Sequence, residues 1–257
     1  MRQLLRIART EVLEHRRQPW MIFILVASYT LWVLIFGAFF LILDWIATQP
    51  EVLQALNQQL GGFGVQLDAF MKLATSTFGS LMFTNLPLFV AFMSGTSVLH
   101  DRESGTMPFL MLAPLTRRRL LMGKLAGAMA IPLVLHLLFV GSSSLVLGRL
   151  SSLAPHAHKL GAAPAWWVAY LVGAPASAAF VGALGTVISA LSRDIRTSMQ
   201  YTSFFIGLLS LGIGFVLVDG ISRGMSLQLG YAAACAIATA LTLLFGAWLI
   251  SKDVTVT

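Results

Sequence analysis

Long apolar runs alternate with short polar segments along the chain. Six of these runs reach the length of a helix that crosses the hydrocarbon core of a membrane, which needs roughly 20 residues. They cover residues 20–43, 73–99, 120–147, 166–191, 201–218 and 227–250. In lipid, a helix satisfies its backbone polar groups within its own segment. The pattern therefore predicts an all-α integral membrane protein, with one transmembrane domain over residues 1–257 and six transmembrane helices.

Residues 1–17, ahead of the first run, have the hydrophobic periodicity of an amphipathic helix. Apolar residues fall on one side of a helix and arginines towards the other, with Leu4, Leu5, Ala8 and Val12 opposed to Arg2, Arg6 and Arg9. A basic amphipathic helix of this kind lies in the membrane interface. It serves either as a simple anchor beside the first span or as a lateral arm that steers a cytoplasmic partner.

The charged residues determine the expected orientation. They make up 11 % of the chain, whereas a soluble domain carries about a quarter. If the N-terminus is cytoplasmic, 13 of the 17 Lys and Arg residues lie on the inner side, as the positive-inside rule requires. Both termini are then expected in the cytoplasm. The net charge of +7 reflects this topology and attraction to anionic membrane lipids, and gives no support for binding nucleic acid.

The chain offers little for catalysis or proton transfer. No acid or base is expected deep inside a span, where proton-driven carriers commonly keep one. His136 is the ionisable residue in the middle of a span, and we expect it to form a hydrogen bond to a neighbouring helix rather than act as a relay. Gly123-Lys124 lacks the glycines of a phosphate-binding loop, and the single cysteine, Cys235, excludes an internal disulfide. We therefore predict neither an enzyme nor a metal site.

Small residues recur at every fourth position in two of the spans. The fourth span has Ala174, Ala178, Gly182, Thr186 and Ala190, and the last has a weaker series, Ala232, Ala236 and Ala240. Such stripes let membrane helices approach closely. We interpret both as packing surfaces between helices.

Residues 100–124 interrupt the apolar pattern with seven charged side chains. Between the charges lies a short apolar helix over residues 107–113, with Thr106 as its N-cap and Pro114 at its end. A cytoplasmic helix this apolar needs a cover. It either folds back onto its own bundle or fills a groove in another protein.

The same segment resembles the cytoplasmic signature of the ABC type 2 permeases. The stretch DRESGTM at 101–107 is followed by Pro114, by Arg117 or Arg118, and by Gly123-Lys124 at the start of the third span. The order of elements also matches over nearly the whole chain. The resemblance implies that residues 100–119 are a coupling loop between spans two and three, whose coupling helix sits in a cleft of a separate ATPase subunit.

The resemblance also implies which residues of the loop contact the ATPase. These coupling residues are Glu103, Gly105, Thr106, Met107, Phe109, Leu110, Pro114, Arg117 and Arg118. Pro108 stands where the family often has an acidic residue, so a polar contact to the ATPase is not expected there.

In such a transporter two ATPase subunits bind ATP and Mg and drive two permease subunits. The permease itself needs no cofactor. The resemblance thus implies that this chain is one permease of a homodimer or heterodimer in the cytoplasmic (inner) membrane of a prokaryote. The expected activity is export of a lipid, a lipid-linked sugar, a peptide or a drug-like molecule.

Spans two and five face the dimer axis in that family, and both carry residues suited to line a path. In span two Ser76, Ser80 and Thr84 share one helix face beside Asn85, and span five adds Tyr201, Phe204, Phe205 and Phe215. We predict that these eight residues line the translocation path. The alternative is that the hydroxyl groups bond only to preceding carbonyls of their own helix.

Three other functions compete with this prediction. A secondary transporter would need no ATPase, but buried charges and broken helices in repeated halves are absent from the sequence pattern. A membrane anchor for an ATPase would keep the coupling loop without transporting anything. An intramembrane enzyme would need a larger polar constellation inside the bundle than His136 and Asn85 provide.

Overall fold

The computed structural model describes residues 2–16, 19–62, 67–107, 116–149, 167–206 and 225–253, and this described part contains helices and no strand. The elements in chain order are α1 (Arg2–Arg16), α2 (Pro19–Thr48), α3 (Pro50–Gly62), α4 (Leu67–Glu103), α6 (Arg117–Arg149), the π-helix η1 (Ala169–Gly173), α9 (Ala174–Leu191) and α11 (Met225–Asp253). A further helical segment covers residues 195–206. The predicted all-α class is confirmed.

Four helices in the described part are long and apolar enough to cross a membrane, at Ile22–Ile42, Arg117–Leu145, Ala169–Leu191 and Met225–Ile250. They correspond to the first, third, fourth and sixth predicted spans. The second predicted span lies within α4, which has 37 residues. The fifth begins in the segment 195–206 and continues outside the described residues. The total of six spans stays a prediction.

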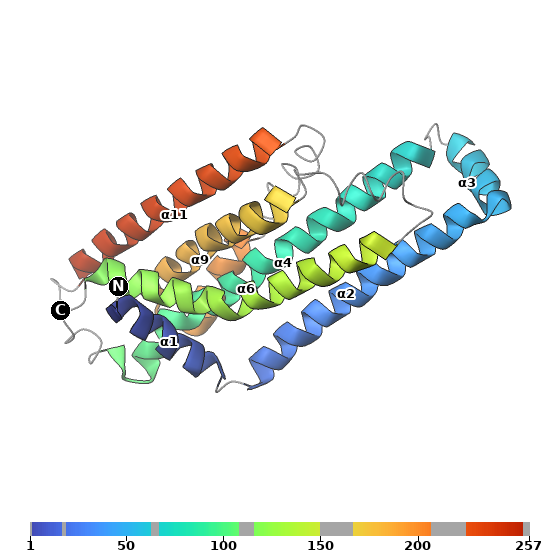
Figure 1. Cartoon of the computed structure of the whole chain (residues 1–257). Helices are drawn as coiled ribbons and strands as arrows, with labels where there is room; N and C mark the ends of the chain where they lie inside the picture. Colours follow the sequence, from blue (N-terminus) through green and yellow to red (C-terminus); the bar gives the residue numbers. More distant parts are fainter. Residues whose placement is uncertain are drawn as a thin grey trace.

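The long helices run side by side along one axis, as Figure 1 shows. α1 lies across one end of this bundle, and both chain termini are at that end. α3 lies at the opposite end, where it joins α2 to α4 (Figure 1). The predicted N-terminal helix is therefore present, but its apolar side is centred on Ile7, which is buried, while Leu5 is exposed.

The small-residue stripe of α9 forms a close contact between helices. Its five residues are all buried, and α9 packs against both α4 and α11. A Cβ atom built on Gly182 would lie 2.6 Å from both Val90 and Leu125, and one built on Gly185 would lie 2.4 Å from the hydroxyl of Ser94. The packing role predicted for this stripe is confirmed.

The packing role predicted for the weaker stripe of the last span is wrong within the described part of the chain. Ala232 is buried, but Ala236 and Ala240 are exposed. The buried face of α11 passes instead through Cys235 and Gly246. A Cβ atom on Gly246 would come within 2.3 Å of Val187 of α9, so a glycine and not the alanines sets this contact.

His136 bonds to a neighbouring helix as expected. Its imidazole is fully buried in α6, and Nε2 lies 3.1 Å from the carbonyl oxygen of Tyr170. Tyr170 belongs to the π-helix η1. In a π-helix the backbone hydrogen bonds join residues five apart instead of four, so different carbonyls are bonded than in an α-helix. The two rings also stack, with centroids 6.1 Å apart. This contact joins α6 to the fourth span.

Candidate functional site

Two glycines in the first turns of α6 bring α1 onto the bundle. A Cβ atom on Gly123 would lie 2.7 Å from the side chain of Ile7. A Cβ atom on Gly127 would lie 2.3 Å from Cβ of Glu11 and 3.1 Å from the backbone oxygen of Ala8. A side chain at position 127 would therefore push α1 away. Glycines four residues apart are a common device for close helix contact in membranes.

This close contact places a charged cluster at the junction of α1, α4 and α6. The ammonium group of Lys124 forms an ion pair with Glu11 of α1 and another, at 2.8 Å, with Asp101 near the end of α4. It also donates a hydrogen bond of 3.2 Å to the backbone oxygen of Ser97. Glu14 is more distant, at 4.0 Å. Lys124, Glu11 and Asp101 are each at most 3 % exposed.

The cluster has too few positive charges for its carboxyl groups. Burial raises the pKa of Glu11 to about 7, and this effect exceeds the opposing attraction of Lys124. The nearby charges of Asp101 and Glu14 raise the same pKa further. Glu11 is therefore poised to change its charge near neutral pH, whereas an ordinary glutamate does so near pH 4.5.

α4 ends at a turn that depends on one glycine. Gly105 has a φ of +71°. The amide of Thr106 donates to the carbonyl of Asp101 at 2.9 Å, and the amide of Gly105 donates to that of Arg102 at 3.2 Å. Together these bonds form the Schellman motif that commonly closes a helix. The first part of the coupling loop, from Asp101 to Thr106, thus has a defined geometry.

The end of α4 is also bonded to two later elements. The hydroxyl of Ser189 in α9 accepts hydrogen bonds from the amides of Val98 and Leu99, at 3.2 and 3.1 Å. The hydroxyl of Ser198 donates to the carbonyl of Gly95. A guanidinium nitrogen of Arg102 lies 3.4 Å from the carbonyl oxygen of Ser192. α4 is therefore bonded to α6, α9 and the segment 195–206, and Lys124 links it to α1.

The segment 195–206 begins at a strong cap. The carboxylate of Asp194 accepts hydrogen bonds from the amide and the hydroxyl of Thr197, at 2.8 and 2.7 Å. These bonds lower the pKa of Asp194. Residues 192–194 form a short turn after α9, and the cap determines where the next helix begins.

The predicted coupling residues are only partly described. Glu103, Gly105 and Thr106 form the exposed turn after α4, and Met107 is buried. The side chain of Arg117 bonds to the carbonyl of Ile250 at the end of α11, whereas Arg118 is exposed. Pro108, Phe109, Leu110 and Pro114 lie outside the described residues.

The predicted path residues do not form one site in the described part of the chain. Thr84 is half-buried and Asn85 is buried in α4. Tyr201 and Phe205 line a cavity of about 420 Å³ beside residues 188–197, which neither Thr84 nor Asn85 lines. Phe204 is 63 % exposed. Ser76 and Ser80 lie in a part of α4 whose side chains are outside the description, and so does the whole of Phe215.

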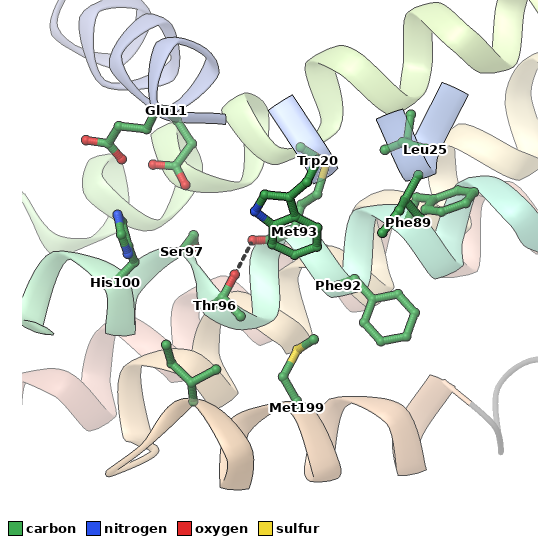
Figure 2. A pocket seen from close by; sticks show the side chains of 13 residues that line it. Glu11, Trp20, Leu25, Phe89, Phe92, Met93, Thr96, Ser97, His100 and Met199 are labelled. Atoms are coloured by element: carbon green, nitrogen blue, oxygen red, sulfur yellow. Dashed lines mark hydrogen bonds between the residues drawn. The ribbon is translucent and has the colours of Figure 1, made fainter. Parts of the chain in front are cut away.

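A larger cavity lies next to the charged cluster. It has a volume of about 630 Å³, and α1, α2, α4 and the segment 195–206 line it. Figure 2 shows Glu11 and His100 at one end of this cavity and Phe89 and Phe92 at the other. Trp20 lies between the two ends, and Met199 is below it (Figure 2). We call this space the α1–α4 cavity.

The sequence pattern alone predicts neither the cluster nor the cavity. It places Lys124 and Asp101 at the ends of spans and Glu11 on an interfacial helix, where charges are usually solvated. One signal was available, because Gly123 and Gly127 flank Lys124 at the spacing that brings helices into contact. A lysine on such a face must meet the next helix, and a carboxylate is the partner that makes its burial tolerable.

Comparison with known proteins agrees with this architecture. A search of curated proteins finds no match to the chain. A family model described as "ABC-2 family transporter protein" matches residues 5–251. The match includes most of α1, the turn at Gly105 and every candidate span in the described part of the chain. The chain belongs to the ABC-2 family of transporter proteins, as a membrane subunit of an ABC transporter.

Proposed function

We propose that this protein is the permease of an exporter whose ATPase is a separate chain. Two ATPase subunits bind the coupling loops of two permease subunits, which form a homodimer or a heterodimer. ATP hydrolysis in the ATPase drives the two permeases to rock about their shared interface. The protein lies in the cytoplasmic (inner) membrane of a prokaryote with six spans and with its termini and coupling loop in the cytoplasm.

The observation that carries this proposal is the junction around Lys124. Asp101 and Gly105 both lie within the coupling loop, four residues apart, and Asp101 is joined through Lys124 to Glu11 of α1. A displacement of the loop therefore moves α1, α4 and α6 as one unit. Charged groups buried this deeply are costly to separate. The ion pairs therefore stay intact when the loop moves, and the movement passes to all three helices.

Exposed aromatic residues on the segment 195–206 support the proposed dimer. Tyr201, Phe204 and Phe205 are 57, 63 and 42 % exposed. Much of each side chain is thus left uncovered by this chain, which suits contact with lipid or with a second permease. The translocation path predicted along spans two and five belongs to this proposal.

Co-purification from the native host tests the proposed partner. The tagged protein is extracted in mild detergent, and bound proteins are identified by mass spectrometry. We expect a cytoplasmic subunit with a phosphate-binding loop. A well-folded preparation without any ATPase would contradict the proposal and favour a secondary transporter.

Substitutions in the turn after α4 test the coupling itself. Glu103→Arg reverses an exposed charge, and Gly105→Trp forces a bulky residue into a φ of +71°, so both should separate ATPase activity from transport. Gly105→Asn is the matched control, since Asn tolerates this conformation better than other side chains. If both disruptive variants transport at the normal rate per ATP hydrolysed, the loop is not the coupling element.

A further inference from the structure

The walls and the ends of the α1–α4 cavity differ in chemistry. Along most of its length the lining is apolar and aromatic, with Ile24, Leu25, Phe89, Phe92 and Met93. At one end are the carboxyl groups of Glu11 and Glu14 and the imidazole of His100, together with polar groups of Ser97 and Thr96. Its volume of about 630 Å³ is that of a typical pocket for a small organic molecule. The cavity therefore fits a molecule with an apolar body and one polar end.

The charge at the polar end of the α1–α4 cavity determines which sign of charge a bound molecule can carry. Neither Lys nor Arg is among the described residues that line the cavity. The nearest ammonium group, that of Lys124, is occupied by Glu11 and Asp101. Glu14 is only 4.0 Å from this ammonium, and its side chain is 28 % exposed. The end of the cavity therefore has an excess of negative charge, which repels phosphate and carboxylate groups.

The aromatic lining of the cavity also favours a positively charged group. Trp20 lies between the acidic end and the phenyl rings in Figure 2, where its indole is available to a cation. Cations bind to the face of a tryptophan more strongly than to other aromatic rings. A flexible side chain, Met199, forms part of the wall and can adapt to bodies of different shape.

We infer that the α1–α4 cavity binds lipophilic cations, molecules with an apolar body and a positively charged head, with the head beside Glu14 and Glu11. This inference rests on the proposed function, because it treats the cavity as the place where the transported molecule first binds. Of the cargo classes that the family resemblance implies, a cavity of this kind favours cationic drug-like molecules over anionic lipids and lipid-linked sugars.

Two probes of equal shape and opposite charge test the inference. The permease is purified with its ATPase, without nucleotide, in detergent, and binding of radiolabelled tetraphenylphosphonium and tetraphenylborate is measured by equilibrium dialysis. We expect saturable binding of the phosphonium and only unspecific uptake of the borate. Glu14→Gln should weaken binding of the phosphonium about tenfold, because it removes the carboxylate nearest to the solvent.

Two further variants locate the site. Phe92→Ala removes part of the apolar wall and should also weaken binding of the phosphonium. Glu51→Gln, in α3 at the far end of the bundle, is a matched control that changes the same net charge and should bind normally. Equal binding of the two probes would overturn the inference, and so would normal binding by Glu14→Gln or a loss of binding in Glu51→Gln.

The outcome separates this inference from the proposed function. If the ATPase co-purifies but the phosphonium does not bind saturably, the permease function stands and the cationic ligand is wrong. If the phosphonium binds in a preparation that never contains an ATPase, the cavity is a cation site and the proposed ATP-driven mechanism fails.

Discussion

The side chain of Lys124 lies between two buried carboxyl groups, those of Glu11 and Asp101, and is paired with both. Replacing it by Met would leave Glu11 and Asp101 without a counter-charge. Breaking a buried ion pair from one side typically costs about 3–5 kcal/mol, whereas removing all its members is often nearly neutral. Two expectations follow: loss of Lys124 alone should destabilise the fold, and removal of all three charges should largely avoid this loss.

We predict that Lys124→Met lowers the thermal midpoint in detergent, measured by size-exclusion chromatography after heating. The triple variant Lys124→Met, Glu11→Gln, Asp101→Asn should recover most of the loss, since no charge then remains buried. If the single variant is as stable as the natural protein, the ion pairs seen here do not support the fold.

The pKa of Glu11 gives a pH dependence with a definite sign. Unfolded chains lose this proton near pH 4.5 and the folded protein near pH 7. Between these values the folded state holds more protons, so stability falls as pH rises, by up to about 3 kcal/mol. Lys124, Asp101 and Glu14 are the charged groups that face Glu11.

We therefore expect the thermal midpoint to decline by several degrees between about pH 5 and pH 8. Glu11→Gln should flatten this decline, because the glutamine has no proton to lose. Glu51→Gln, on an exposed carboxyl of α3, should leave the slope unchanged. An equal slope in all three proteins would show that Glu11 has an ordinary pKa.

At the scale of secondary-structure elements, α1 can pack closely on α6 because residue 127 is a glycine and has no side chain. A Cβ atom at position 127 would meet Cβ of Glu11 and the backbone oxygen of Ala8, at 2.3 and 3.1 Å. Backbone cannot move aside as the end of a flexible side chain can. Gly127→Ala should therefore loosen α1 even though alanine favours a helix by about 1 kcal/mol over glycine.

Limited proteolysis measures this loosening directly, through cleavage at the arginines of α1. Gly127→Ala should be cut faster than the natural protein. Gly141→Ala in the same helix is the control, since nothing lies within 4 Å of the added carbon, and it should be cut at the natural rate. Equal rates for the two variants would mean that α1 is not held by close packing.

The elements themselves were more predictable than their contacts. Four spans, the N-terminal helix and the α9 stripe follow from local patterns that a single segment carries. The partners of Lys124 do not, because Glu11 and Asp101 lie 113 and 23 positions away in the sequence. The wrong interpretation of Ala236 and Ala240 has a similar cause. A stripe of small residues indicates that contact is possible, but the facing helix decides which stripe is used.

For the whole molecule, the charge distribution predicts which end faces the cytoplasm. Both termini lie at the same end of the bundle as α1, and α3 lies at the other end (Figure 1). Most Lys and Arg residues fall on the side of the termini, so this end should be cytoplasmic. The only natural cysteine, Cys235, is buried, and thiol reagents should therefore report introduced cysteines against a low background.

Gln58→Cys in α3 and Arg196→Cys at the start of the segment 195–206 test this orientation, because both side chains are exposed. A maleimide that cannot cross membranes should label position 58 in intact cells freed of their wall. It should label position 196 only in inverted vesicles. The unmodified protein should take up little label in either case. The reverse pattern would place the coupling loop outside, where no ATPase could reach it, and the proposed mechanism would fail with the topology.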